Sequence, residues 1–364
     1  MHKSSAWPLA LLYTALIVYA SLFPFADWRD QGLNPFSFLW QPLPRYWTWF
    51  DVCINVLGYL PFGFLLCVGC LRSDRVAYAV LIATIVATLL SLGMETTQSY
   101  LVRRVASNVD LALNSAGAFS GAVCASLLHR VGGLAYWSRI RSRWFVPKAR
   151  GGIVLLASWP FALLFPTAVP LGLGQVVERL EAGLADWLAD TPYLKWLPVR
   201  EIELQPLLPG PAAVCIALGL LIPCLLAYCV VRGGRRRAVT LLALLSLAVG
   251  VTALSAALGF GPQHAWDWLD EPSRAGLLVA LILASLLLFI PQRVAAALAL
   301  LALGIYLALL NQATVGPYFL LAVNGWEQGQ FIRFHGLAQW LAWIWPFALL
   351  VYLVALISAR DGKT

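Results

Sequence analysis

Residues 211–231 read PAAVCIALGLLIPCLLAYCVV, an apolar run without one charged side chain. A helix of about 20 such residues crosses the roughly 30 Å hydrocarbon core of a bilayer. Similar runs recur along the whole chain. Because lipid offers the backbone no water, these runs should be helices. Transmembrane barrels would instead show weak, alternating segments of about ten residues, which this sequence lacks. The sequence therefore predicts an all-α, polytopic integral membrane protein that is a helical bundle.

The overall composition excludes a soluble domain. Of the 364 residues, 61% are apolar and 12% are charged, and the mean hydropathy is +0.78. Soluble domains carry charge on about a quarter of their residues. The shortage of charge is therefore as informative as the excess of Leu and Ala.

About ten transmembrane helices account for the apolar runs. The first of them is not a cleaved signal peptide in our interpretation, because Phe23, Pro24 and Phe25 offer no small-residue cleavage site. The predicted spans are 7–25, 52–71, 76–94, 109–128, 152–170, 211–231, 238–260, 275–291, 294–311 and 337–358.

The positions of the charges predict the topology. With the N- and C-termini in the cytoplasm, the inner loops hold 16 of the 25 Lys and Arg but only two of the 17 Asp and Glu. This is the positive-inside bias of membrane proteins. The net charge of +8 is thus a topology signal, and we expect membrane lipids rather than nucleic acid as partners. We predict a multi-pass protein of the bacterial cytoplasmic membrane.

The chain should divide at a basic loop. We predict a four-helix membrane domain at 1–130, a basic cytoplasmic loop at 131–151 and a six-helix membrane domain at 152–364. The last domain carries outer segments at 172–210 and 312–336. The first of these contains an apolar helical face, which favours either a helix on the outer leaflet or one packed over the span ends. The second should be a re-entrant or surface-lying loop.

Metal ions and cofactors are not expected. All seven Cys residues fall inside predicted spans, where they pack as small apolar residues. The outer loop around His264 and Asp267 is better explained as a solvated acidic segment than as a metal site. The P-loop, G-x-S-x-G, H-E-x-x-H and Rossmann patterns are all missing from the sequence.

Polar residues at the outer ends of the first four spans are the candidate binding site. Such residues are costly in a membrane and are functional candidates by default. Three of the four spans carry a carboxylate with a carboxamide three or four positions away, hence on one helical face. The predicted ligand-binding residues are Asp51, Asn55, Glu95, Gln98, Arg103, Arg104, Asp110 and Asn114.

Small residues in the same spans predict close helix packing. Gly117 and Gly121 are four apart, a spacing that lets two helices approach closely. Gly58, Pro61 and Gly63, which follow Asn55, favour a kink or a broken start in their span. A purely structural role stays open for the polar set as well. Asp110 could cap its helix, and Glu95 could form an ion pair with a following Arg.

Three segments together resemble a known family. They are NVLGYLPFGFLL at 55–66, ETTQSYLVRR at 95–104 and DLALNSAGAFSG at 110–121. This order of Asn, Pro-Phe-Gly, Glu-x-x-Gln, Arg, Asp, Asn and spaced Gly is similar to that of the VanZ-like membrane proteins, over roughly residues 7–130. The resemblance implies an association with resistance to the glycopeptide teicoplanin, whose target lies outside the membrane. It implies no settled biochemical activity, and the six later spans have no counterpart in the short founding proteins.

Three functions remain open on the sequence. The first is an envelope protein that handles a lipid-linked or cell-wall-related anionic headgroup, with Arg103 and Arg104 on its phosphate or carboxylate. The second is a transporter or lipid flippase, although its polar set would be confined to one side rather than near the midplane. The third is a membrane-embedded enzyme that uses Glu95 or Asp110 as a general base.

Overall fold

The computed structural model describes most of the chain. All structural statements below concern these residues: 6–22, 25, 27–32, 34–42, 49–73, 76–102, 104–147, 149–196, 206–312 and 332–358. Of Phe50, Asp51, Glu178, Arg179, Ala182 and 332–337, only the backbone is described. This part of the chain is helical, with two isolated β-bridges, and it forms two compact units, Met1–Arg141 and Ser142–Thr364.

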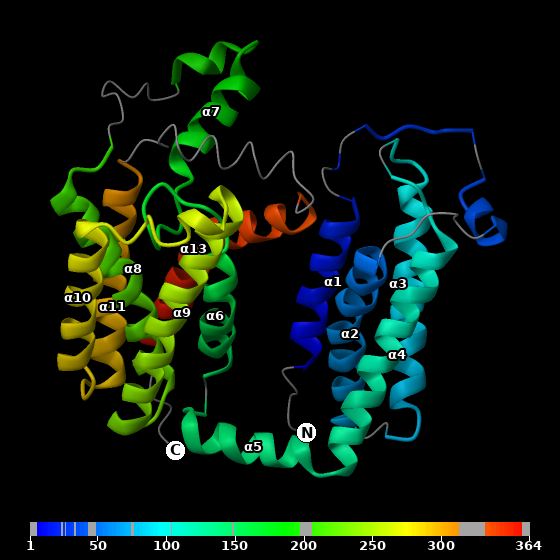
Figure 1. Cartoon of the computed structure of the whole chain (residues 1–364), viewed down its shortest axis with the longest axis horizontal. Helices are drawn as coiled ribbons and strands as arrows, with labels where there is room; N and C mark the ends of the chain where they lie inside the picture. Colours follow the sequence, from blue (N-terminus) through cyan, green and yellow to red (C-terminus); the bar gives the residue numbers. More distant parts are fainter. Residues whose placement is uncertain are drawn as a thin grey trace. The chain divides into compact units, whose positions relative to one another are not determined.

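The N-terminal unit is built on four apolar helices (Figure 1). They are α1 (Ala6–Leu22), α2 (Trp49–Leu71), α3 (Ala79–Gln98) and α4 (Asn108–Arg130), and a short 3-10 helix, η1 (Ser37–Trp40), lies between the first two. Small side chains such as Ala83, Ala87, Ala118 and Ala122 form the contact layer and are fully buried. Alanine at these positions lets the helices approach closely, as is usual where lipid provides no hydrophobic drive.

Glycine residues let α2 and α4 approach each other closely. A Cβ atom on Gly117 would overlap the carbonyl oxygen of Val56, and one on Gly121 would overlap that of Leu60. On the facing helix, a Cβ on Gly63 would overlap the backbone of Ala118. The two helices therefore touch backbone to backbone. Pro61 sits inside α2, which continues as a helix to Leu71.

The predicted basic loop contains a helix. Residues Gly133–Trp144 form α5, which follows α4 after a turn at Gly132, whose φ is +75°. The boundary between the two compact units, at Arg141 and Ser142, falls within this helix.

The C-terminal unit packs around one buried helix. Nearly all of α8 from Cys215 to Val230 is buried, and α10, α11, α6 and α9 contact it. The elements of this unit are α6 (Arg150–Ala162), α7 (Val177–Leu188), η2 (Pro192–Trp196), α8 (Pro209–Val230), α9 (Gly234–Phe260), η3 (Pro262–His264), α10 (Glu271–Leu286), α11 (Gln292–Leu310) and α13 (Ile332–Ser358).

One arginine ties the helix ends of this unit together. Arg237, in the first turn of α9, donates to the carbonyl oxygens of Tyr228 at 2.7 Å, Ile290 at 2.8 Å and Leu288 at 2.9 Å. A further bond reaches Val231 at 3.2 Å. The last carbonyl groups of a helix have no partner inside it. Arg237 therefore closes the ends of both α8 and α10.

Fewer of the described helices are long enough to cross a membrane than the sequence predicts. Each of the ten predicted spans overlaps a described helix, but seven helices are long and apolar enough to cross a membrane: α2, α3, α4, α8, α9, α11 and α13. The helices α1, α10 and α6 have 17, 16 and 13 residues. At about 1.5 Å of rise per residue, α6 reaches about 20 Å.

The predicted span 152–170 is wrong in its second half. The helix α6 ends at Ala162, and residues 163–176 are not helical. Pro166 and Pro170 cannot donate to a helix, and Leu171 and Gly174 have φ of +62° and +94°. The run is apolar enough to read as a span, but its prolines and glycines stop the helix.

Side chains from α11 and its C-cap pair with the backbone of this irregular segment. The Tyr306 hydroxyl donates to the Leu171 carbonyl at 2.6 Å and accepts the Leu173 N–H. Asn311 accepts from the N–H groups of Val176 and Val177 at 3.1 and 3.2 Å. Irregular backbone at membrane depth is tolerated only where protein groups or water pair with it.

The two predicted outer segments are described to different extents. The first contains the expected short helix, α7, whose Leu180, Leu184 and Trp187 are exposed. Residues 313–331 of the second lie outside the described residues, so its re-entrant or surface-lying character stays a prediction.

Candidate functional site

The first contact of the candidate site joins α2 to α4. The Asn55 side-chain amide donates to Asp110 Oδ1 at 2.9 Å, and both side chains are half-buried. Asp110 lies in the first turn of α4, where the helix dipole favours a negative charge. Two residues predicted to bind a ligand therefore contact each other across the helix pair.

Glu95 holds the beginning of α4 from the neighbouring helix. Its carboxylate accepts the backbone N–H of Ser107 at 2.8 Å, and its side chain is only 4% exposed. Ser107 is the N-cap of α4, and its hydroxyl accepts from the Asp110 N–H. In a capping box, a Glu of the same helix bonds the N-cap N–H. Here Glu95 of α3 takes that role.

Gln98 and Arg104 contact the last turn of α1. The Gln98 amide donates to the Ser21 carbonyl at 2.9 Å, and Arg104 Nη2 lies 3.5 Å from the Ala20 carbonyl oxygen. The second distance is at the outer limit for a hydrogen bond. These contacts bring α1 to the same end of the unit as Asn55, Glu95 and Asp110. We call the residues Asn55, Glu95, Gln98, Arg104, Asp110 and Asn114 the polar mouth.

A buried polar seam continues from the polar mouth between α3 and α4. Asn114, 6% exposed, donates to the fully buried Ser91 hydroxyl at 3.0 Å. One turn further, Thr88 donates to Ser115 at 3.0 Å. The Asn114 carbonyl oxygen is buried and accepts no hydrogen bond within the described part of the chain. Sequence reasoning missed Ser91, Thr88 and Ser115, although Thr88, Ser91 and Glu95 follow a helical spacing.

Two loops pack over the polar mouth. Trp28 and Leu101 form an isolated β-bridge, and the Gln31 amide donates to the Ser99 carbonyl at 2.8 Å. The Asn108 amide donates to the Gln41 carbonyl at 2.7 Å, and Phe38 is 2% exposed. The mouth is thus bordered by ordered backbone from the α1–α2 and α3–α4 connections.

Some predicted site residues are not placed. Arg103 lies outside the described residues, and the Asp51 side chain does as well, although its backbone belongs to α2. The role that the sequence predicts for each of them stays a prediction. The packing residues Pro61, Gly63, Gly117 and Gly121 lie along α2 and α4, as described above.

The chemistry available at the mouth is hydrogen bonding and charge. Within the described ranges, no three His, Cys, Asp or Glu side chains come together as a metal site would require. Both carboxylates, Glu95 and Asp110, accept hydrogen bonds from neighbouring groups. Each carboxylate is therefore already used in part by the protein's own hydrogen bonds.

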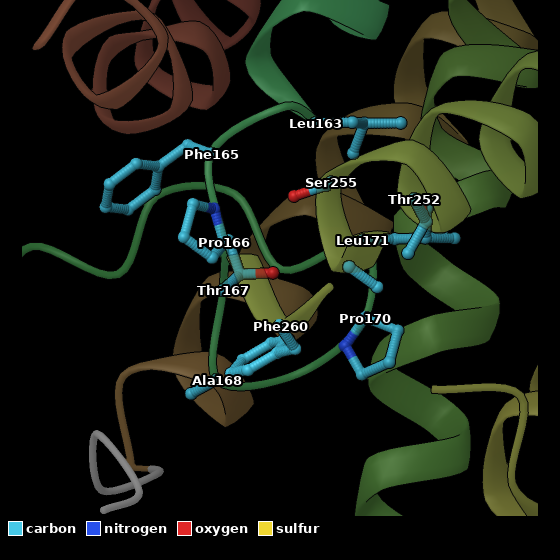
Figure 2. Close-up of a pocket in the computed structure, with 11 residues that line it drawn as sticks. Leu163, Phe165, Pro166, Thr167, Ala168, Pro170, Leu171, Thr252, Ser255 and Phe260 are labelled. Carbon is cyan, nitrogen blue, oxygen red and sulfur yellow. The ribbon is translucent and has the colours of Figure 1, made fainter. Parts of the chain in front are cut away.

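The C-terminal unit has a pocket of its own beside the irregular segment (Figure 2). Its volume is about 140 Å³, and Pro166, Thr167 and Pro170 face Ser255 and Phe260 of α9 across it. Ser255 donates to the Leu164 carbonyl at 2.9 Å, which fixes the segment to α9. The sequence analysis missed this pocket because it predicted an unbroken span here. The prolines and glycines of PTAVPLGLG at 166–174 indicate the break in the helix.

Comparison with known proteins gives one result. No curated protein and no solved structure matches the chain. The family described as VanZ/LLP1 matches residues 8–129, which span α1 to α4 and therefore the polar mouth and the seam. The resemblance seen in the sequence is thus confirmed for the N-terminal third, and the membrane-helical character fits it. Residues 8–129 of this chain are thus similar to the VanZ/LLP1 family.

Proposed function

We propose that the polar mouth binds the headgroup of a lipid-linked component of the bacterial cell envelope. The headgroup carries sugar or amide donors and a negative charge. The binding face is the outer face of the cytoplasmic membrane. The protein acts as an envelope accessory protein rather than as an enzyme, and its association with glycopeptide resistance is part of the proposal.

One observation carries the proposal. Asn55, Gln98 and Asn114 each use the amide nitrogen in a contact with the protein. None of their carbonyl oxygens accepts a hydrogen bond from a described residue, and that of Asn114 is buried. A buried acceptor without a donor costs about 1–3 kcal/mol. A ligand with hydroxyl or amide N–H groups would supply the missing donors.

Charge at the mouth supports the negative part of the ligand. Arg104 is half-buried at the rim, and a guanidinium pairs with phosphate or carboxylate in two-pronged fashion. The sequence places Arg103 beside it. Glu95 and Asp110 are hydrogen-bonded within the mouth, so they hold the carboxamides and the α4 N-terminus instead of meeting the ligand.

Binding by purified protein tests the proposal. Full-length protein in nanodiscs is titrated with a lipid-linked peptidoglycan precursor, with phosphatidylglycerol as the reference lipid. Arg104→Gln and Asn114→Leu should each weaken precursor binding about tenfold, which corresponds to about 1.4 kcal/mol. Arg274→Gln, which removes a positive charge from α10, is the matched control and should bind as wild type. Equal binding of the precursor and of phosphatidylglycerol by the wild-type protein would contradict the proposal.

Cells provide the second readout. Expression of the chain in a teicoplanin-susceptible bacterium should raise the inhibitory concentration of teicoplanin. The Arg103→Gln/Arg104→Gln variant should lose this effect at the same level of membrane expression. If the double variant still raises resistance, the arginines of the polar mouth do not cause the resistance.

Transport is the second candidate, and the C-terminal unit favours it. Discontinuous helices with unwound backbone often line substrate sites in transporters. Here α6 ends at Ala162, and the segment 163–176 borders a pocket on α9. In vesicles that contain the protein, a fluorescent phosphatidylglycerol in the inner leaflet should move to the outer leaflet. A membrane-impermeant quencher should therefore quench nearly all of the label instead of only the outer half. Full protection across several headgroups would argue against a flippase.

A further inference from the structure

The helix α5 has two chemically different faces. At 100° per residue, four of its large apolar side chains fall on one face: Tyr136, Trp137, Ile140 and Trp144. Arg141 borders this face on one side, and Arg139 and Arg143 border it on the other. An aromatic and aliphatic stripe between arginines is the pattern of a helix that lies in a membrane interface.

The N-terminal half of the stripe is exposed, whereas Ile140 and Trp144 are partly covered. No residue of α5 is buried, and Tyr136 and Trp137 are 61% and 54% exposed. Tyr and Trp concentrate where hydrocarbon meets the headgroups, because each ring has an apolar body and a polar tip. A lipid interface would therefore suit this face.

The turn before α5 places it at that interface. Gly132, with φ at +75°, ends the course of α4, and α5 runs across the end of α4 instead of continuing it (Figure 1). Because α4 is long and apolar enough to span the bilayer, a helix across its end lies at headgroup level.

The C-terminal end of α5 is held in place by two more arginines. Within the C-terminal unit, Arg232 donates from Nε to the Phe145 carbonyl and from its backbone N–H to the Trp144 carbonyl, both at 2.8 Å. Arg236 donates to the Arg143 carbonyl. These bonds satisfy the last carbonyls of α5 and bring the guanidinium groups of Arg232 and Arg236 to its C-terminal end.

The sequence on either side of α5 and of these two arginines is free of acidic residues. Neither 111–177 nor 204–266 contains an Asp or Glu. Positively charged groups held at one helix end favour an anion beside them. At headgroup level the abundant anions are lipid phosphates.

We infer that α5 is an interfacial helix that binds anionic phospholipid headgroups through Arg139, Arg141 and Arg143. Its aromatic stripe enters the boundary of the acyl chains, and the arginines extend to the phosphates. This inference does not rest on the proposed function, since α5 lies at the Arg130 end of α4 and the polar mouth at the Asn108 end.

Lipid retention by the intact protein tests this inference. Full-length protein in neutral detergent is titrated with phosphatidylglycerol or phosphatidylcholine, and bound lipid is counted by native mass spectrometry. Wild type should prefer phosphatidylglycerol, and added salt should reduce the preference. The Arg139→Gln/Arg141→Gln/Arg143→Gln variant should bind phosphatidylglycerol at least about tenfold more weakly. The corresponding triple Lys variant should retain most of the preference.

Two controls separate α5 from other causes. Arg29→Gln/Lys195→Gln/Arg274→Gln removes three positive charges elsewhere and should leave the preference unchanged. Inorganic phosphate at millimolar concentration should not displace the lipid, because the aromatic stripe needs acyl chains. Equal binding of the two lipids by wild type, or an unchanged preference in the triple Gln variant, would overturn the inference. So would displacement by phosphate alone.

Discussion

Asn55 and Asp110, 55 positions apart in the chain, meet through one hydrogen bond of 2.9 Å between the second turn of α2 and the first turn of α4. The bond joins a carboxamide to a carboxylate in a half-buried setting, where its energy is greater than in water. The contact of Gly117 with Val56, the residue after Asn55, is the nearest of the glycine contacts between these two helices. The polar mouth therefore depends on the same helix pair that the glycines hold together.

A double-mutant cycle should show this coupling. Asn55→Ala and Asp110→Ala should each lower the free energy of unfolding in detergent by about 1–3 kcal/mol, because each leaves a polar partner unpaired. The double variant should lose less than the sum, with a coupling energy of at least about 0.5 kcal/mol. Additive losses would mean that the bond contributes nothing to the fold.

Backbone contact at Gly117 and Gly121 gives a sharper test. Alanine at either position would overlap a carbonyl of α2 and force α2 and α4 apart. We expect each Ala variant to lose more than about 2 kcal/mol of stability, as other overpacked cores do. Thermal unfolding in detergent measures this loss.

Gly93 provides the matched control for that test. It lies inside α3, and a Cβ there would meet no neighbouring atom within 4 Å. Gly93→Ala should raise stability by up to about 1 kcal/mol, since Ala is the better helix former. A similar loss at Gly93 and Gly117 would show that helix packing is not the cause.

Much of the N-terminal unit could be predicted from the sequence, for a physical reason. Apolar runs of span length predict α2, α3 and α4, and polar residues three or four apart predict one face at each helix end. The seam hydroxyls were not predictable in this way. A Thr in an apolar helix can bond its own preceding turn, as Thr84 does with the Val80 carbonyl, so its residue type does not reveal a partner on another helix.

The C-terminal unit shows where hydropathy misleads. Residues 152–170 are apolar throughout, but helix formation also depends on where backbone groups can pair. The partners of the irregular segment, Tyr306 and Asn311, lie more than 130 positions later in the chain. Such a contact belongs to the tertiary structure, and no local pattern announces it.

Removing the Tyr306 hydroxyl should loosen this segment. Tyr306→Phe leaves the Leu171 carbonyl and the Leu173 N–H without their described partner, at a cost of about 1–3 kcal/mol each. Hydrogen exchange followed by mass spectrometry should show faster exchange across residues 171–177. Tyr193→Phe, at an exposed position in η2, should leave the exchange of that segment unchanged. Unaltered exchange in Tyr306→Phe would mean that other groups hold the segment.

Cysteine labelling should settle which membrane face carries the polar mouth. Val105 is 82% exposed beside the mouth, and Val131 is 77% exposed just beyond the other end of α4. Single Cys residues at these positions, in a protein whose seven native Cys are replaced, report both ends of one span. A membrane-impermeant thiol reagent applied to intact cells should label Val105→Cys alone. Val131→Cys should react only once the cytoplasmic face is opened. The reverse pattern would place the mouth in the cytoplasm and remove the basis for an outer envelope ligand. Labelling of both positions from outside would mean that α4 does not cross the membrane.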